Sequence, residues 1–320
     1  MGRYIIRRLL LAIPLLVMVS IVVFLLIHLL PGGPQAVLFN PHLTAAARQA
    51  LTAKYHLDQP IWTQYRFWLQ GVATGDFGSS FADGQPVTTD IGARIPATLE
   101  LFGAALIFAL IIAIPLGIIS AVRQYSVIDY SITFLSYFGI SMPIFFFALV
   151  LQEIFGVKLQ WLPVFGRTSD VTYAAGYDYL IDDFLHLILP MVVLSLAFMA
   201  GWSRYMRSSM LEVIRQDYMR TARSKGLGTT AILVRHGLRN AMIPVLTIVA
   251  LDFGSIAGGA AITETIFAWP GLGRLFIDAL TARDYPVLLA MLLMSAVVVI
   301  LFNLIADVLY GVLDPRIRYN

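Results

Sequence analysis

Residues 220–244 read RTARSKGLGTTAILVRHGLRNAMIP and separate two long apolar runs of the chain. They carry no acidic residue and five basic ones, Arg220, Arg223, Lys225, Arg235 and Arg239. Lysine and arginine accumulate in the short cytoplasmic loops of membrane proteins and are costly inside hydrocarbon. The stretch therefore predicts a loop between two membrane spans, and it orients the spans on either side of it.

The composition of the 320-residue chain is that of a membrane protein. Hydrophobic residues make up 59% of it and charged residues 13%, and the mean hydropathy is +0.80. Soluble domains average about 25% charged and about 45–50% apolar residues. A spanning helix needs about 20 mostly apolar residues, and a continuous apolar run indicates a helix rather than a barrel strand. Six runs qualify and predict an all-α membrane protein with six transmembrane helices: 9–30, 97–122, 130–155, 185–203, 241–267 and 286–313.

The basic residues give the expected orientation. Segment 204–240 holds eight of them against two acids, the first eight residues hold three, and the tail adds Arg316 and Arg318. Under the positive-inside rule both termini and segment 204–240 are expected in the cytoplasm. Segment 31–96 is then expected on the outer side.

These runs divide the chain into three parts. Residues 1–30 form the N-terminus and first span, 31–96 an extracytoplasmic segment, and 97–320 a core of five spans with the cytoplasmic loop 204–240. Within the outer segment, 43–57 and 62–72 are predicted as short helices, separated and followed by proline and glycine signals. The segment is either a docking surface for a partner or a lid without one.

No signature of an enzyme occurs in the sequence. The P-loop pattern GxxxxGK[ST] and the hydrolase patterns HExxH and GxSxG are absent, and no two of the five histidines are four residues apart. The chain has no cysteine, which excludes disulfides and thiolate sites. We therefore expect no catalytic residue, cofactor, metal site or nucleic-acid partner in this chain. An ion-driven secondary carrier remains an alternative, although such carriers usually have inverted repeats and more spans.

The basic loop has an internal order beyond its charge. Residues 216–226 are predicted as a short helix that Gly226 and Gly228 end, and a second helical stretch leads into the fifth run. One interpretation is charge for topology and for anionic lipid. The other is a rigid handle that a groove on a soluble partner grips.

The order of residues in this loop resembles that of permeases of binding-protein-dependent ABC importers, in particular the dipeptide, oligopeptide and nickel class. TARSKGL, HGLRN and IPV occur together in residues 221–245. LLPGGP (29–34), SMPIFF (141–146), ETIFAWPGLGRL (264–275) and NLIADVLYGVLDPRIRY (303–319) resemble further segments of the same permeases. The resemblance covers nearly the whole chain and implies the type I importer permease fold in the inner membrane of a prokaryote.

The resemblance also implies partners. In that family the loop forms a coupling helix in a groove of a separate ATPase, and here the contact would be made by Asp217, Tyr218, Arg220, Thr221, Ala222, Arg223, Lys225, Gly226 and Leu227. The implied partners are two ATP-binding subunits that hold ATP and magnesium, a second permease subunit in a heterodimer, and an external substrate-binding protein. The implied cargo is peptide-like; nickel chelates, haem or sugars are alternatives within the class.

One acid, Asp252, lies inside the fifth apolar run. A charged residue at the centre of a span costs about 2.5–3.5 kcal/mol on insertion scales, so it is expected to face the bundle interior or a water-filled path. Asp252 either lines the translocation route, with Ser141 and Pro143, or is hydrogen-bonded between two packed helices. Pro115, Pro143, Pro190 and Pro244 are each expected to bend a span.

Overall fold

The computed structural model describes residues 2–30, 32–39, 44–169, 171, 176–254 and 260–313. In chain order its helices are α1 (Gly2–Leu29), η1 (Pro34–Phe39), α2 (Ala45–Tyr55), α3 (Ile61–Ala73), α4 (Val87–Val122), α5 (Val127–Ser141), α6 (Ile144–Leu151), η2 (Gln152–Lys158), α7 (Gly176–Ile214), α8 (Asp217–Ser224), α9 (Thr229–Ile232), η3 (Leu233–Leu238), α10 (Arg239–Phe253), α11 (Ala261–Ile266), α12 (Leu272–Ala282) and α13 (Tyr285–Leu313). The predicted all-α class is confirmed, and segment 31–96 contains two short helices, α2 and α3, near the two ranges predicted for it.

Five helical stretches are long and apolar enough to cross a membrane, or six if a bent pair of helices is counted as one span. The five are Ile6–Leu29, Val87–Val122, Gly176–Ile214, Thr229–Phe253 and Tyr285–Val308. The pair is Val127–Ser141 with Ile144–Lys158, and the two helices meet at 102°. The third predicted span is therefore a broken helix rather than a continuous one.

The helices that carry the fourth and fifth predicted spans do not begin and end where the apolar runs do. Helix α7 has 39 residues, about 58 Å at 1.5 Å per residue, because it continues through polar residues at both ends. The fifth span begins at Thr229 and ends at Phe253, whereas we expected 241–267. Backbone hydrogen bonds do not depend on hydropathy, so the helix extends through the basic residues before 241. Helix α11 is a separate element, and residues 255–259 lie outside the described part.

Several helix boundaries follow from local sequence. Thr44 begins α2 by accepting a hydrogen bond from the Ala47 amide at 3.2 Å, and Ser126 begins α5 in the same way with Asp129. Helices α4 and α6 follow Pro86 and Pro143, which lack an amide donor and suit a helix start. The other prolines expected to bend spans, Pro115, Pro190 and Pro244, lie inside α4, α7 and α10, which continue past them.

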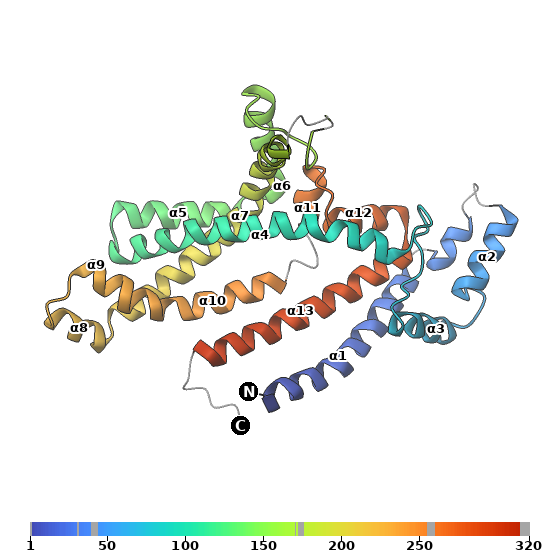
Figure 1. Ribbon diagram of the computed structural model, residues 1–320, viewed down its shortest axis with the longest axis horizontal. Coiled ribbons are helices and arrows are strands. Elements are labelled where there is room, and N and C mark those ends of the chain that lie inside the picture. The colour runs from blue at the N-terminus through green and yellow to red at the C-terminus, as the bar shows by residue number, and fades with distance from the viewer. Residues whose placement is uncertain are drawn as a thin grey trace.

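The long helices run along the molecule between two ends that carry short helices (Figure 1). Helices α8 and α9 lie at one end, and α2 and α3 lie at the other. Helix α1 runs beside α13, and α7 packs against α4, α5 and α10. The start of α1 and the end of α13 point toward the end that carries α8, and an ion pair between Arg8 and Asp307 joins them at 2.7 Å.

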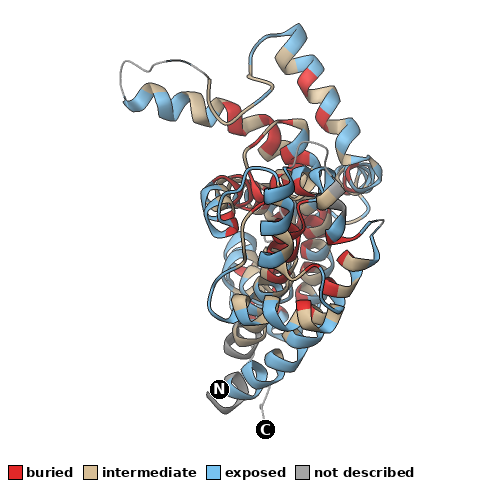
Figure 2. Cartoon of the chain, turned by 90° about the vertical axis from the view of Figure 1, so that its right-hand side faces the viewer, coloured by how far each residue is buried: buried red, intermediate tan, exposed pale blue. Residues whose placement is uncertain are grey.

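The main core lies where α4, α7 and α10 cross. Leu106, Met206 and Trp202 are buried there, and Figure 2 shows buried residues inside the molecule and exposed ones on the outer turns. Lipid is as apolar as leucine, so close packing rather than removal from water holds such helices together. Gly117 permits this contact, because a Cβ at that position would lie 2.7 Å from the Ser203 carbonyl oxygen of α7.

Candidate coupling site

Helix α8 is an extension of α7, separated from it by only Arg215 and Gln216. Met219 and Ala222 are three residues apart and therefore share one face of α8. Both are buried, at 0% and 7% exposure, and belong to the same cluster as Met206 and Met210 of α7. Gly237 of η3 closes the contact, since a Cβ there would lie 2.9 Å from the Met210 methyl group. The short helix is thus fastened to the bundle by its apolar face.

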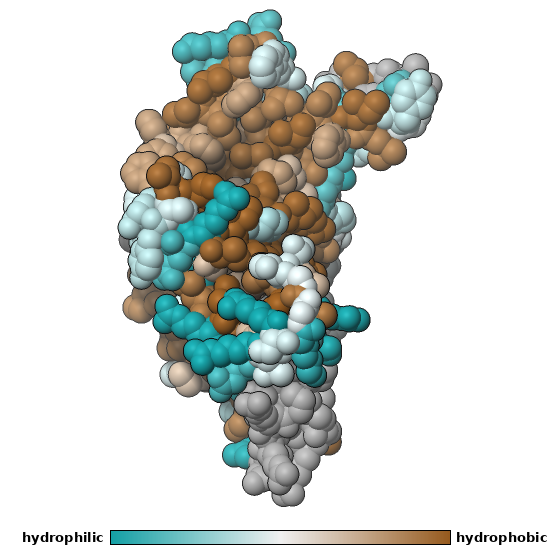
Figure 3. Space-filling view, turned by 90° about the vertical axis from the view of Figure 1, so that its left-hand side faces the viewer, coloured by the Kyte–Doolittle hydropathy of each residue, from teal (hydrophilic) through white to brown (hydrophobic). Residues whose placement is uncertain are grey.

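The opposite face of α8 and the turn after it are exposed. Eight of the nine residues expected to contact a partner lie there: Asp217, Tyr218, Arg220, Thr221, Arg223, Lys225, Gly226 and Leu227. Ala222 is the exception, because its side chain is buried and packs in the main core. Figure 3 looks onto this end of the molecule and shows hydrophilic side chains gathered across it.

The turn after α8 depends on glycine. Gly226 has a φ of +75°, which glycine adopts at little cost and other residues avoid. Its amide donates to the Arg223 carbonyl at 2.9 Å, and the Lys225 amide donates to that of Thr221 at 3.2 Å. Gly228 is extended, with φ −65° and ψ 147°, and begins α9. The predicted glycine stop is therefore confirmed, and the second helical stretch follows it as α9, η3 and α10.

Charge and hydrogen bonding stabilise both ends of α8. Asp217 lies in its first turn and Arg223 in its last, each where the helix dipole favours that sign of charge. Partial burial raises the pKa of Tyr218, and a hydrogen bond that its hydroxyl oxygen accepts from the Asn240 side chain acts against that rise. This bond joins α8 to the start of α10. Helix α8 is thus connected to both α7 and α10.

An ion pair with a buried carboxylate, which sequence reasoning missed, joins α7 to α5 upstream of α8. The Arg207 guanidinium donates through Nε and Nη2 to both carboxylate oxygens of Asp129, at 2.7 and 2.8 Å. Asp129 is 2% exposed and also accepts from the Ser120 hydroxyl of α4 and from the Tyr125 amide at 2.9 Å. Helices α4, α5 and α7 therefore meet at one carboxylate, and the Arg207 that pairs with it lies five residues before Glu212 in α7. In the sequence, Ser126 marks the start of the helix that holds Asp129, but no local pattern indicates that Arg207 is the partner of Asp129.

Asp252 connects α10 to α7. The Trp202 indole donates to its carboxylate Oδ2 at 2.7 Å, and Asp252 is half-buried. This is the arrangement expected of an acid hydrogen-bonded between two packed helices. A role in the translocation route stays a prediction.

Ser141 and Pro143 lie at the break between α5 and α6. Helix α5 ends at Ser141, Met142 adopts an extended conformation, and Pro143 precedes α6. Both Ser141 and Pro143 are exposed, so they point away from the rest of this chain. They are about 110 residues earlier in the sequence than Asp252, and no contact between the two groups is among the interactions described. Their role in a route likewise stays a prediction.

Comparison with known proteins agrees with this architecture. Residues 113–319 match the family described as binding-protein-dependent transport system inner membrane component, and residues 1–102 match its N-terminal companion. The chain is 47% identical to the oligopeptide transport system permease protein AppB of Bacillus subtilis over all of both chains. It is 42% identical to the dipeptide transport system permease protein DppB of Alkalihalophilus pseudofirmus over 99% of each chain, and 40% identical to the glutathione transport system permease protein GsiC of Escherichia coli over all of both.

The full-length matches, the five or six apolar spans and the exposed basic helix lead to one conclusion. The chain belongs to the family of binding-protein-dependent transport system inner membrane components, the multi-pass permease subunits of prokaryotic ABC importers.

Proposed function

We propose that this chain forms one half of a membrane pore that moves peptides inward, with ATP hydrolysed by separate subunits. Its relatives are named as permeases of oligopeptide, dipeptide and glutathione transport systems, and all three kinds of cargo contain peptide bonds. A second permease subunit, different in sequence, completes the pore. The chain itself performs no hydrolysis.

The proposal rests on helix α8, which is exposed and basic on one face and packs against the helix bundle with the other. Met219 and Ala222 transmit a displacement of α8 to α7, and Tyr218 transmits it to α10. The Asp129–Arg207 pair then transmits it to α4 and α5. Movement of α8 by an ATPase would therefore reorient several spans together, which is what alternating access requires.

The partners are assigned to the two ends of the molecule that carry short helices. Two ATP-binding subunits, with their ATP and magnesium, contact α8 and the turn that follows it in the cytoplasm. A substrate-binding protein delivers cargo at the opposite end, where α2 and α3 extend beyond the spans. In this arrangement both termini are cytoplasmic.

A cross-linking experiment tests the assignment. The natural chain has no cysteine, so Leu227→Cys introduces one thiol into the exposed turn. In the assembled complex this thiol should cross-link to an ATP-binding subunit. The matched control is Trp62→Cys on α3, which is also exposed but lies at the other end. Cross-linking of Trp62→Cys but not Leu227→Cys to the ATPase would refute the proposal. Uptake of a labelled dipeptide into vesicles that contain ATP supplies the functional readout.

A further inference from the structure

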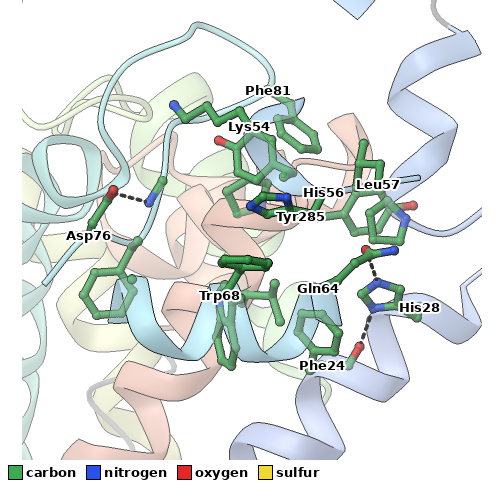
Figure 4. Close-up of a pocket in the computed structure, with 18 residues that line it drawn as sticks. Phe24, His28, Lys54, His56, Leu57, Gln64, Trp68, Asp76, Phe81 and Tyr285 are labelled. Atoms are coloured by element: carbon green, nitrogen blue, oxygen red, sulfur yellow. Dashed lines mark hydrogen bonds between the residues drawn. The ribbon is translucent and has the colours of Figure 1, made fainter. Parts of the chain in front are cut away.

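The cavity between segment 31–96 and the spans marks where that segment packs on the bundle (Figure 4). It measures about 220 Å³, and α1, α3 and the first turn of α13 contribute to its walls. Phe24 of α1 packs against Trp68 of α3 with ring centroids 5.5 Å apart, and His28 of α1 bonds Gln64 of α3 at 3.2 Å. These contacts fasten the segment to the spans. A charge in a less usual setting lies elsewhere, on α7.

Arg204 of α7 lies over a ring of α5, deeper in the bundle than the Asp129–Arg207 pair. Its guanidinium carbon is 5.0 Å from the centroid of the Tyr137 ring. Tyr137 is eight residues beyond Asp129, about 12 Å along α5 and away from the end that carries α8. Helix side chains lean toward the N-terminus of their own helix, so the Arg204 side chain reaches back from the α8 end into the spans.

No opposite charge accompanies Arg204. Among the residues that the structure describes, none with a negative charge pairs with its guanidinium, and Arg207, one turn further along α7, takes Asp129. The Arg204 Nε atom is buried without a hydrogen-bond partner, so it faces the protein. The residue as a whole is half-buried, and its two terminal nitrogens are not among the buried unpaired atoms. Those two nitrogens are therefore the part of the charge that another molecule can reach.

Arg204 borders an exposed stripe of α5. Tyr130, Phe134, Tyr137 and Ser141 follow one another at intervals of four, three and four residues and therefore share one face. All four are exposed, Tyr137 by 55%. Hydroxyl groups and a guanidinium are poorly suited to hydrocarbon, and charged residues within spans face a bundle interior or a water-filled cavity. The stripe thus suits a path for a polar solute, and Ser141 is a residue already predicted to line the route.

The chemical group that fits this setting is a carboxylate. Arginine keeps its positive charge in proteins, and the edge of its planar guanidinium donates two parallel hydrogen bonds to a carboxylate. Stacking on a ring holds the guanidinium plane and leaves the donors at that edge available. A peptide carries one carboxylate at its C-terminus whatever its side chains are.

We propose that Arg204 is a specificity-determining residue of the translocation route, where its terminal nitrogens bind the C-terminal carboxylate of the peptide in transit. Tyr137 is its positioning residue, because the ring holds the guanidinium in place. The inference rests on the proposed function. It deepens that function by assigning one chemical group of the cargo to one side chain of the permease.

Uptake of two labelled ligands by the complete complex in proteoliposomes tests the assignment. Alanyl-alanine has the carboxylate, and alanyl-alaninamide has an uncharged amide in its place. Arg204→Gln should lower uptake of alanyl-alanine about tenfold, as expected for the loss of a charge-assisted hydrogen-bonded pair, and leave uptake of the amide unchanged. Arg204→Lys keeps the positive charge and should recover most of the lost uptake. The binding protein is the same in every variant, so its own preference cancels when the ratio of the two uptakes is compared between variants.

Arg123→Gln is the matched control, because Arg123 is an exposed arginine at the end of α4. It should leave both uptakes unchanged. An equal decrease for both ligands in Arg204→Gln would indicate a structural role or a lipid contact and overturn the proposal. Loss of the second permease subunit from the Arg204→Gln complex would indicate an acid of that subunit as the partner and overturn it as well. Uptake by the natural complex with a ratio that Arg204→Gln does not change refutes the role of Arg204 alone, whereas no uptake by the natural complex refutes the proposed function itself.

Discussion

Asp129 shows how one carboxylate can connect several helices of a membrane bundle. It accepts hydrogen bonds from α4, from the turn after α4 and from Arg207 of α7, while being 2% exposed. Removing one partner of a buried ion pair leaves the other charge uncompensated, which costs about 3–5 kcal/mol in soluble proteins. An isolated exposed pair contributes about 1 kcal/mol at most.

We therefore expect Arg207→Ala to lower the thermal unfolding temperature of the purified chain strongly. Lys158→Ala is the matched control, because the Lys158–Glu153 pair is exposed on both sides and is 3.5 Å long. The control should unfold close to the natural temperature. Equal decreases in the unfolding temperature of the two variants would show that the Asp129–Arg207 pair stabilises the chain no more than the exposed pair does.

At Asp252 the hydrogen bond to Trp202 leads to a second prediction. Asparagine retains an acceptor oxygen at this position, so Asp252→Asn should keep the contact between α10 and α7 and leave the unfolding temperature nearly unchanged. Leucine has no acceptor and leaves the Trp202 donor unsatisfied, which costs about 1–3 kcal/mol. Asp252→Leu should therefore unfold at a lower temperature.

Peptide uptake by the complex then separates the two interpretations of Asp252. If Asp252→Asn takes up peptide at the natural rate, the charge of Asp252 has no role in the translocation route. Loss of uptake by a variant with the natural unfolding temperature would place the charge in the route.

At the scale of elements, α8 works as a handle only if the turn behind it keeps its shape. Proline fixes φ near −65°, whereas Gly226 has a φ of +75°, so Gly226→Pro is incompatible with the turn. We expect it to uncouple ATP hydrolysis from uptake in the assembled complex while the chain remains in the membrane. Uptake at the natural rate would count against a mechanical role for α8.

Gly228→Ala is the matched control for this turn. Gly228 already has a φ of −65°, and a Cβ there would meet nothing within 4 Å. Alanine should therefore be tolerated, with ATP hydrolysis and uptake coupled as in the natural complex. A defect of equal size in both variants would point to a general intolerance of the loop rather than to its backbone geometry.

At the scale of the whole molecule, the two ends that carry short helices should lie on opposite sides of the membrane. Lys225→Cys and Asp58→Cys place single thiols in exposed positions at the α8 end and between α2 and α3, respectively. A membrane-impermeant thiol reagent should label Asp58→Cys in intact cells and Lys225→Cys only after permeabilisation. Labelling of Lys225→Cys from outside would reverse the proposed orientation and exclude contact between α8 and a cytoplasmic ATPase.

Much of this architecture follows from the sequence alone. Continuous apolar runs predict spanning helices because lipid offers the backbone no hydrogen-bond partners. Glycines 226 and 228 predicted the end of α8 because their backbone preference is local. Apolar runs did not predict where α7 and α10 begin or end, since a helix continues through polar residues that its neighbours accommodate.

Only the tertiary structure decided which residues meet. Asp129 and Arg207 are 78 residues apart, and Trp202 and Asp252 are 50 apart, so no local pattern pairs them. The burial of Ala222 and the cavity between α1, α3 and α13 likewise depend on how the helices pack. Composition and local backbone preference determined the class of the protein and its elements, whereas long-range packing determined its contacts, because contacts depend on positions in space that sequence order does not contain.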